Sequence, residues 1–498
     1  MSRSSMHQIS HDWLAERLHD WPDGSGPMYV RLAAALERLL QGGEMPDGTR
    51  LPAERLLAAA LQVSRTTVAA AYELLEDGRL VQRRHGSGTY VQGIKAPAPP
   101  APRESLLMRS LERNEIFDGL LDPPRDLLDF RAAALHDSAP LPESALEALM
   151  GDLRRAGMTH GYLPAGVTEL RAAVADRHTA IGLPTGPEEV LITSGAQQAI
   201  ALITMLHLRS DDTVVTEALT HTGAIDLFNA SGARIRTVGV DRSGADIDDI
   251  IDRLADRPRM LYLVPSIHNP LGGTMPARSR RRLAAVVAEH PDIVVVSDDT
   301  LADTYRNLRP PPPLASYPGA GHILHIGSLS KLLWAGLRIG WVRGPAPEIR
   351  RLARLKALSD LGTGVPGQLL ALRLLQLGPD YEEGRRDLIA QRGRHLQQRL
   401  GQHLPDWTWT EPDGGLCLWV RLPDGGAKQL SMRAARQGLA VAPGSIQSPE
   451  GHFGDHVRLP YGHPEEVLDV AVDRLARAWR GQSTPLGLTA LDDLHVVV

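Results

Sequence analysis

Residues 327–331 read Gly-Ser-Leu-Ser-Lys, and Arg338 follows seven residues after the lysine. Only four of the 54 Lys and Arg residues are lysines, so an ordinary surface cation would nearly always be an arginine. A lysine amine, unlike a guanidinium, can lose its proton when desolvated and condense with an aldehyde to form a Schiff base. The hydroxyls of Ser328 and Ser330 and the guanidinium of Arg338 suit a phosphate. The stretch therefore predicts pyridoxal phosphate bound at Lys331, although a solvated lysine is the alternative.

The length of 498 residues predicts two or three domains with separate cores. The composition is that of a soluble globular protein, and we see no charged-then-apolar leader and no apolar run of about 18 residues. We therefore expect a cytoplasmic protein without a membrane partner. The single cysteine, Cys417, excludes an internal disulfide and a cysteine-built zinc site, and the histidines form no HExxH pair. A net charge of −5 means that basic patches must be local.

The N-terminal part of the sequence predicts three helices. Residues 28–42 carry apolar side chains at helical spacing and end at a Gly-Gly pair. Pro52 fits the first turn of a second helix, and Ser64 is a good N-cap for a third. Three polar residues project from the first turn of that third helix: Arg65, Thr66 and Thr67. A short helix, a tight turn and a helix with a polar tip are typical of a recognition helix that enters the DNA major groove.

Residues 79–91 read as two short strands around a glycine-rich tip, which predicts a wing. Gly86 would let this tip approach a minor groove closely, and Arg55, Arg83 and Arg84 could neutralise phosphates. The segment holds only slightly more arginines than acidic residues. A small adaptor domain with solvated arginines is therefore the alternative.

Short apolar, β-branched runs recur through residues 190–326, with helical stretches between them. The runs are residues 190–193, 213–216, 235–240, 260–264, 293–296 and 323–326. Strands that alternate with helices predict an α/β fold, with a mostly parallel sheet covered by helices on both faces. In such sheets ligands sit beyond the carboxyl ends of the strands, so the residues after each run are candidates for a binding site.

Residues suited to pyridoxal phosphate follow four of these runs. After the first run comes a small-residue turn that opens a helix and could hold the phosphate: Ser194, Gly195, Ala196 and Gln197. Asn269 could hydrogen-bond the phenolic oxygen of the ring, and Asp298 could keep the pyridine nitrogen protonated. Lys331 follows the last run. A tight turn or a loop Asn-Pro explains each feature singly, but the four together predict one cofactor site.

Two stretches resemble known families. LPAERLLAAALQVSRTTVAAAYELLEDGRL, followed by RRHGSGTYV, is similar to the winged-helix DNA-binding domain of GntR-type regulators. This resemblance implies that six residues face DNA: Arg55, Ser64, Arg65, Thr66, Thr67 and Gly86. The second resemblance is to a fold-type I pyridoxal-phosphate domain of the class I and II aminotransferase kind. It rests on the residues that follow the four strands and on three further stretches: His160 to Gly166, Gly414 to Cys417 and Val457 to Leu459.

The aminotransferase resemblance implies roles for two further residues. Arg458 would bind a carboxylate of a substrate or effector, a role suited to a guanidinium, although a surface arginine at a strand edge is the alternative. Tyr162 would reach the phosphate of the neighbouring subunit, because such domains usually pair so that each completes the other's site.

The whole chain resembles the MocR subfamily of bacterial transcription regulators. We expect a GntR-type domain at residues 1–92, a Pro-rich linker at 93–125, an aminotransferase-like domain at 126–480 and a C-terminal tail at 481–498. The family implies a head-to-tail homodimer that binds operator DNA and a small-molecule effector.

Two positions depart from the family pattern. His221 stands where the family usually has a Tyr that stacks on the cofactor ring, so it either stacks instead or is an ordinary loop histidine. Thr300 stands where the family usually has a Tyr whose phenol bonds the cofactor. This loss predicts inefficient transamination.

Three functions remain from the sequence. We favour a transcription regulator that senses pyridoxal phosphate, or an amine or amino acid, through a Schiff base at Lys331. The first alternative is a working aminotransferase with an accessory N-terminal domain, and the second is a dimerisation scaffold that has lost its cofactor. The operator and the effector are not specified by the sequence.

Overall fold

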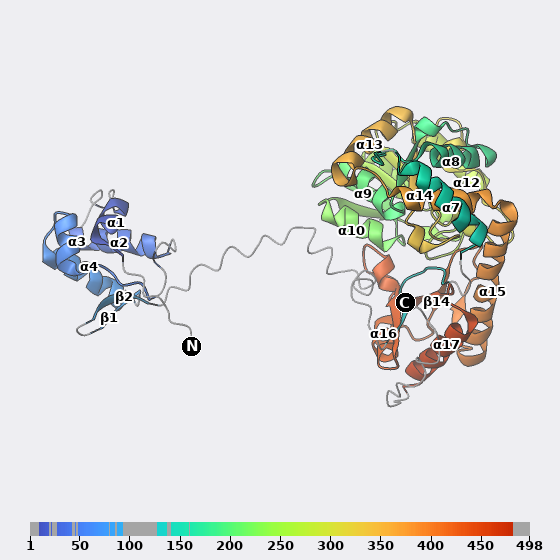
Figure 1. Ribbon diagram of the computed structural model, residues 1–498. Coiled ribbons are helices and arrows are strands. Elements are labelled where there is room, and N and C mark those ends of the chain that lie inside the picture. Colours follow the sequence, from blue (N-terminus) through green and yellow to red (C-terminus); the bar gives the residue numbers. More distant parts are fainter. Residues whose placement is uncertain are drawn as a thin grey trace. The chain divides into compact units, whose positions relative to one another are not determined.

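The computed structural model describes residues 9–18, 21, 27–41, 45, 48–78, 80–84, 87–92, 127–136, 141–158 and 160–481. The chain forms two compact units, residues 1–105 and 106–498 (Figure 1). The predicted linker at 93–125, the predicted tail beyond Gly481, and Gly86 lie outside the described residues.

The N-terminal unit is a helical domain with a β-hairpin. Its elements are α1 (His11–Arg17), α2 (Met28–Gln41), α3 (Glu54–Ala60), α4 (Arg65–Asp77), β1 (Val81–Arg84) and β2 (Gly88–Val91). Ser64 caps α4, because its Oγ accepts the N–H of Thr67 at 3.1 Å. The buried face of α4 includes Tyr72, whose hydroxyl donates to the carbonyl of Pro52 at 2.9 Å and fixes α4 against the start of α3. The predicted helices and the predicted hairpin, which pairs antiparallel, are confirmed.

The large unit contains a seven-stranded sheet of order β4-β12-β11-β10-β9-β5-β6. Its strands are β4 (Val190–Thr193), β5 (Thr213–Glu217), β6 (Arg234–Val238), β9 (Met260–Leu263), β10 (Val294–Asp298), β11 (Leu324–Ser328) and β12 (Gly340–Arg343). The six predicted runs are all strands, and the predicted mostly parallel sheet is confirmed. The seventh strand, β12, was not predicted; it runs antiparallel to both of its neighbours, β4 and β11.

Helices cover both faces of this sheet (Figure 1). They are α7 (Glu143–Ala156), α8 (Thr168–Ala180), α9 (Ala196–His207), α10 (Thr222–Ala230), α11 (Ile247–Ala255), α12 (Ala277–Ala288), α13 (Ala346–Asp360) and α14 (Val365–Gln376). Successive residues of a strand point to opposite faces, so neighbouring residues join different cores. In β12, Trp341 packs in the core that includes α8, and Val342 packs in the core that includes α9.

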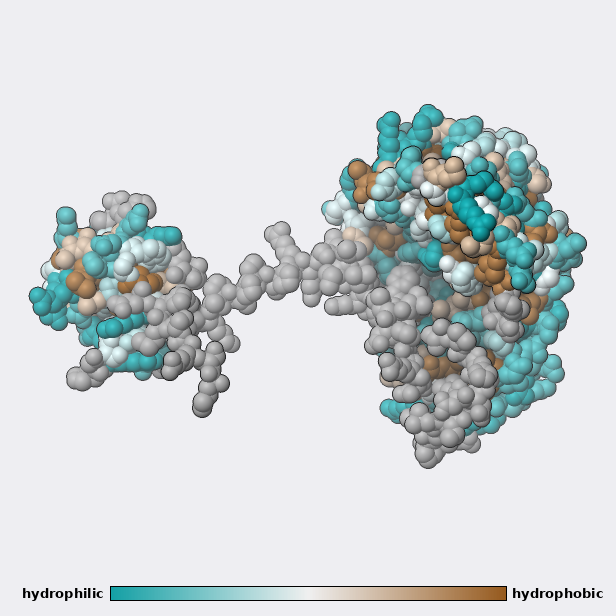
Figure 2. Space-filling view, viewed as in Figure 1, coloured by the Kyte–Doolittle hydropathy of each residue, from teal (hydrophilic) through white to brown (hydrophobic). Residues whose placement is uncertain are grey.

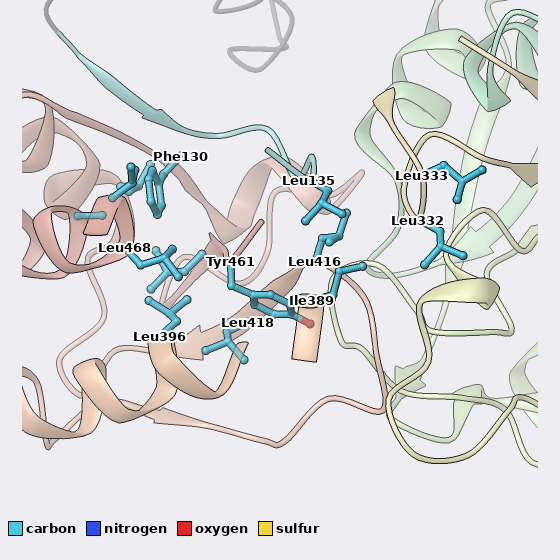
Figure 3. Packing of buried hydrophobic residues seen from close by; sticks show 14 of the residues in the cluster. Phe130, Leu135, Leu332, Leu333, Ile389, Leu396, Leu416, Leu418, Tyr461 and Leu468 are labelled. Carbon is cyan, nitrogen blue, oxygen red and sulfur yellow. The ribbon is translucent and has the colours of Figure 1, made fainter. Parts of the chain in front are cut away.

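A second sheet has five strands in the order β13-β14-β16-β15-β3. They are β3 (Leu128–Phe130), β13 (Thr408–Trp409), β14 (Cys417–Arg421), β15 (Leu439–Pro443) and β16 (His456–Pro460), with α15 (Pro379–His403), α16 (Ala427–Ala435) and α17 (Glu465–Trp479) beside them. Figure 3 shows Phe130, Leu396, Leu418 and Leu468 within the core cluster of this sheet. The same cluster includes Leu332 and Leu333, so the core of the second sheet is continuous with the segment that carries Lys331.

A buried carboxyl group joins two strands of the large sheet. Glu217, at the end of β5, is fully buried, and its carboxyl oxygens accept the backbone N–H of Val264 at 3.0 and 3.2 Å. Burial raises the pKa of Glu217 to about 8, although the hydrogen bond from Val264 opposes the rise. Near neutral pH this side chain is therefore mostly protonated. His268 lies next to it and is also buried; burial lowers the pKa of His268 to about 4.

We expect Glu217→Gln to flatten the pH dependence of stability. A carboxyl group whose folded pKa is raised stabilises the fold at low pH, and this contribution falls as the pH rises from the unfolded pKa toward the folded one. Relative to the variant, the wild type should lose about 2 kcal/mol of unfolding free energy between about pH 6 and pH 8. Thermal melts followed by circular dichroism measure this difference.

Glu466→Gln is the matched control, because Glu466 is an exposed residue of α17. It should show the same pH profile as the wild type. Parallel profiles for wild type and Glu217→Gln would contradict the buried, protonated carboxyl.

Candidate functional site

The predicted phosphate turn lies between the end of β4 and the start of α9. Gly195, which precedes α9, has a φ of 85°, a left-handed conformation that glycine adopts without strain. The N–H of Ser194 donates to Gln198 Oε1 at 2.8 Å, so it is occupied. The first-turn N–H groups of a helix have no intrahelical acceptor, so those of Ala196 and Gln197 could donate to an anion at this end. The turn can therefore hold an anion.

Arg338 lies directly against this turn. Its backbone is also left-handed, with a φ of 52°, and its Nη2 donates to the carbonyl of Ser194 at 3.0 Å. A side chain at Gly195 would collide with it, since a Cβ there would lie 2.9 Å from Arg338 Nη2. The predicted turn and the predicted arginine are thus brought together, and the guanidinium adds a positive charge beside the N-terminus of α9.

Lys331 lies three residues beyond β11, and its Nζ donates to the carbonyl of Ala133 at 2.8 Å. Burial lowers the pKa of Lys331 to about 8, and the positive charges of Arg458 and Arg338 act in the same direction. A much larger fraction of this amine is neutral near physiological pH than of an exposed lysine. The neutral amine is the form that attacks an aldehyde.

The two serines before Lys331 have different roles. Ser328 Oγ donates to the carbonyl of Ile339 at 3.2 Å and accepts the N–H of Ser330 at 3.1 Å, so it organises the loop rather than offering a free hydroxyl. Ser330 Oγ is buried and has no partner among the described residues. Of the two predicted phosphate contacts, Ser330 is therefore the one with a vacant hydrogen-bonding position.

Asp298 is the last residue of β10 and is 5% exposed. Its carboxylate accepts the hydroxyl of Tyr262 at 2.5 Å and the N–H of Thr300 at 3.0 Å. Burial, and then the negative charge of Asp298, raise the pKa of Tyr262 well above its ordinary value. Tyr262 was missed from the sequence, because only the pairing of β9 with β10 brings it to Asp298.

His221 precedes α10, and its Nε2 is 2.9 Å from Gln197 Oε1. Burial lowers its pKa to about 4, against the negative charge of Asp298, and the positive charges of Lys331 and Arg458 lower it further. Its contact with Gln197 places His221 beside the phosphate turn. Its part in the cofactor site and its stacking on a ring both stay predictions.

Arg458 lies on β16, between β14 and β15, and is 5% exposed. Its Nη2 donates to the carbonyl of Arg131, and its Nε is buried with no partner among the described residues. Burial lowers its pKa. The alternative of a surface arginine at a strand edge is wrong, because a buried guanidinium with a vacant donor favours an anionic ligand.

Asn269 and Tyr162 were predicted to contact the cofactor ring and the phosphate of the neighbouring subunit, and these two contacts stay predictions. Asn269 is half-buried and no hydrogen bond of its side chain occurs among the described residues; it neighbours Pro270, whose carbonyl is 4.0 Å from Cys417 Sγ. Tyr162 is 63% exposed and stacks loosely on His160. Thr300, where the sequence lacks the family's phenol, has a buried hydroxyl without a partner in the described structure.

The candidate DNA-binding residues lie at the tip of α4 and on the hairpin. Arg65 is exposed and pairs with Glu54, with Nε 3.2 Å from Oε2. Thr66 and Thr67 turn their hydroxyls to Ser64 Oγ at 2.7 and 2.8 Å. Arg55 is exposed on α3. The tip of the predicted recognition helix, α4, is therefore accessible and preorganised.

The two hairpin arginines differ. Arg83 donates to the carbonyl of Ala69 at 2.9 Å and lies 3.6 Å from Glu76, so it joins the hairpin to α4 instead of being a free cation. Arg84 lies over the ring of Tyr90 at 4.8 Å and is exposed. Of the two predicted phosphate contacts, only Arg84 is available without breaking an interaction with an acidic residue.

The described residues contain no cluster of three or more His, Cys, Asp or Glu side chains that could hold a metal ion. Within the same part of the chain, no helix is both long and apolar enough to cross a membrane.

Comparison with known proteins places both units in families. Residues 127–475 match the family "Aminotransferase class I and II", and residues 28–91 match "Bacterial regulatory proteins, gntR family". The HTH-type transcriptional regulator YdfD of Bacillus subtilis is 30% identical over 452 residues, which cover 88% of this chain and 93% of YdfD. The probable rhizopine catabolism regulatory protein MocR of Rhizobium meliloti is 28% identical over 449 residues, covering 85% of this chain and 88% of MocR.

An aminotransferase structure matches at similar identity. LysN, the alpha-aminoadipate aminotransferase of Thermus thermophilus, is 32% identical, with a TM-score of 0.67 that covers 75% of this chain and 97% of LysN. Its crystal structure is a complex with N-(5'-phosphopyridoxyl)-L-leucine. Regulators match along most of this chain, whereas LysN matches the large unit. With a gntR-family domain followed by a class I and II aminotransferase domain, the chain belongs to the MocR-type transcriptional regulators.

Proposed function

We propose that this regulator binds pyridoxal phosphate at Lys331 and changes its affinity for operator DNA in response to the cofactor or to an amine or amino acid. The observation that carries the proposal is the convergence of a neutralisable lysine, an anion-holding turn and a buried carboxylate at one edge of the sheet. Bound pyridoxal phosphate would supply an aldehyde that links to an amine and a ring that withdraws electrons.

The residues of the site fit this group. The turn at Gly195, the guanidinium of Arg338 and the vacant hydroxyl of Ser330 suit the phosphate. Asp298 suits the protonated ring nitrogen, and its hydrogen bond from Tyr262 holds the carboxylate in one orientation. LysN, with a phosphopyridoxyl amino acid bound, supports both the cofactor and an amino-acid effector for this fold.

Arg458 suits the carboxylate of such an effector. Its Nε lacks a partner in the described structure, and its charge acts on both Lys331 and His221. An amino acid that places its carboxylate on Arg458 would therefore present its amine near Lys331. A carboxylate bound to Arg458 would also raise the pKa of Lys331, because it would offset the positive charge of Arg458, which lowers that pKa.

The effector must prefer one conformation of the protein to change DNA affinity. A ligand shifts an equilibrium only by the difference between its affinities for the two states. We infer that the two states differ in how the gntR-family domain is presented to an operator.

Replacing Lys331 by Ala should abolish the visible absorbance band of the lysine-bound cofactor, because no other amine would occupy this position. Absorbance spectra of purified protein, titrated with pyridoxal phosphate, measure the effect. Lys428→Ala, at an exposed position on α16, should keep the band. A wild type that stays colourless with excess cofactor would favour the scaffold function.

An aminotransferase remains the second candidate, because Asp298, Lys331 and Arg458 also suit transamination. Two features favour the regulator. Thr300 stands where the family usually has a tyrosine, and the tip of α4 is preorganised by the hydrogen bonds of Thr66 and Thr67 to Ser64. Steady conversion of an amino acid and an oxo acid by the wild type would reverse this preference.

Replacing Arg65 by Ala should weaken specific DNA binding about tenfold and reduce the salt slope by about one. Arg65 offers an exposed guanidinium at the N-terminus of the recognition helix, and the variant loses one contact to the duplex. Fluorescence anisotropy at several salt concentrations measures both quantities, with a duplex that the wild type enriches from a random library.

Arg38→Ala is the control, since Arg38 is an exposed cation in the last turn of α2. It should bind the same duplex like the wild type. Unchanged binding by Arg65→Ala would mean that α4 is not the recognition helix.

We propose that the large unit forms the predicted head-to-tail homodimer through an exposed apolar surface. Leu146 and Met150 share one face of α7, and Met158 and Tyr162 follow it; all four are exposed. A Cβ at Gly362 would lie 2.7 Å from the carbonyl oxygen of Leu163, so the backbones of these two residues are close together. Each has an exposed apolar neighbour in sequence, Leu361 and Tyr162. Figure 2 shows hydrophobic residues among hydrophilic ones on the face that carries α7 and α14. Exposed apolar groups of this kind mark interaction surfaces.

Met150→Glu should weaken the dimer at least about tenfold, because a carboxylate would be buried in an apolar interface. Sedimentation velocity over a concentration series measures the dissociation constant. Met432→Glu introduces the same change at a 53% exposed methionine of α16 and should leave the dimer intact. A monomeric wild type, or a dimer unaffected by Met150→Glu, would contradict this interface.

A further inference from the structure

A separate cavity lies on the α8 side of the large sheet. Its volume is about 150 Å³, and it is lined by the end of α8, the segment of residues 299–313 and the strands β11 and β12. None of Lys331, Asp298, His221 and Arg458 lines it. It is therefore distinct from the candidate cofactor site.

Consecutive aspartates at the end of β10 separate the two sites. Asp298 accepts the hydroxyl of Tyr262, which packs in the α9 core, whereas Asp299 Oδ2 lies 3.0 Å from Nδ1 of His325. Neighbouring residues of an extended strand point to opposite faces of a sheet. The cofactor site uses the first carboxylate, and the second is left for the cavity.

His178 offers the cavity a hydrogen-bond donor. It is 3% exposed, and its Nε2 accepts the indole N–H of Trp341 at 2.9 Å. Burial, and then the charges of His325 and Arg343, hold the pKa of His178 well below its ordinary value, so the ring is neutral. A neutral imidazole that accepts at Nε2 carries its hydrogen on Nδ1. That Nδ1 has no partner among the described residues.

Asp299 offers a hydrogen-bond acceptor. Its Oδ2 accepts the hydroxyl of Ser297 at 2.7 Å, while Oδ1 is buried without a partner within hydrogen-bonding distance in the described structure; the nearby hydroxyl of Ser266 contributes to the lowering of the Asp299 pKa. Burial alone would raise the pKa of Asp299, but His325 and Arg280 lower it below its ordinary value, so the group is an anion. A buried carboxylate oxygen without a donor is costly to maintain.

Apolar side chains form part of the remaining wall, and they include Ile181, Tyr305, Pro311 and Pro313. Charged residues also line the cavity; among them, Arg177 forms ion pairs with Asp303 and Glu382. An engineered cavity of comparable volume in another protein holds one benzene ring. The volume therefore suits one six-membered ring, and both residues with an unsatisfied polar atom, His178 and Asp299, line the cavity.

We propose that this cavity is a second small-molecule site, which takes a planar ring bearing a carbonyl oxygen and an N–H group, as in a lactam, a cyclic imide or the edge of a pyrimidine base. The carbonyl accepts from His178 Nδ1, and the N–H donates to Asp299 Oδ1. Ser328, which also lines the cavity and accepts the N–H of Ser330, places the bound ring beside the loop that leads to Lys331.

The probe is α-pyridone, which has both groups on one ring, with N-methyl pyridone and toluene as matched ligands. Saturation-transfer NMR titrations on the full-length protein measure the affinities. We expect α-pyridone to bind, and N-methyl pyridone, which lacks the N–H, to bind about fivefold more weakly. Toluene should bind more weakly than α-pyridone. Equal affinities for the three ligands, or no binding of α-pyridone, would overturn the proposal.

Two variants test the location. Ala180→Trp places a large side chain at the cavity from an exposed position of α8 and should abolish α-pyridone binding. Asp176→Trp, at an exposed position of the same helix outside the cavity, should leave binding unchanged.

Saturating pyridoxal phosphate separates this site from the one at Lys331. It should not change the affinity for α-pyridone, whether or not it binds to Lys331. Competition between the two, or full binding by Ala180→Trp, would show that the probe occupies another pocket and would refute the second site.

Discussion

The candidate cofactor site depends on the close approach of two glycines between β4 and β12. A Cβ at Gly340 would lie 2.7 Å from the backbone carbon of Gly195, and a Cβ at Gly195 would collide with Arg338. The chain can make this approach only because both positions lack a side chain. With β12 inserted antiparallel between β4 and β11, the anion-holding turn, the guanidinium and the lysine segment come to one edge of the sheet. Substitution at either glycine would separate the turn from Arg338 without changing a charged residue.

Burial then sets the charges of the site. The pKa values of Lys331, His221 and Arg458 are all lowered mainly by desolvation, and the positive charge of Arg458 lowers the pKa values of Lys331 and His221 further. The site is therefore short of negative charge, with Asp298 as the principal counter-charge. An anionic cofactor and a carboxylate-bearing effector would relieve this imbalance, which gives a physical reason for ligand-dependent change in a regulator.

The end of β10 divides the large domain into two chemically different regions. Asp298 is oriented by the hydroxyl of Tyr262 on one face, and Asp299 lies against His325 on the other. Trp341 and Val342 of β12 divide in the same way between the α8 core and the α9 core. Two adjacent carboxylates thus lie on opposite faces of the sheet, because the strand alternation is fixed by the packing of both faces.

The sequence by itself determined the strands along the chain, the helix-turn-helix and the turn at Gly195, because these depend on local periodicity and capping. It also proposed Lys331 as the cofactor lysine, because lysine is rare in this chain. It did not reveal β12, because this strand has only four residues, 340–343, and follows closely after the left-handed residue Arg338. It also missed Tyr262 and left Arg458 open between surface and interior. Those features were decided by tertiary structure, since strand pairing and burial join residues far apart in the chain, and desolvation exists only after the two sheets have packed.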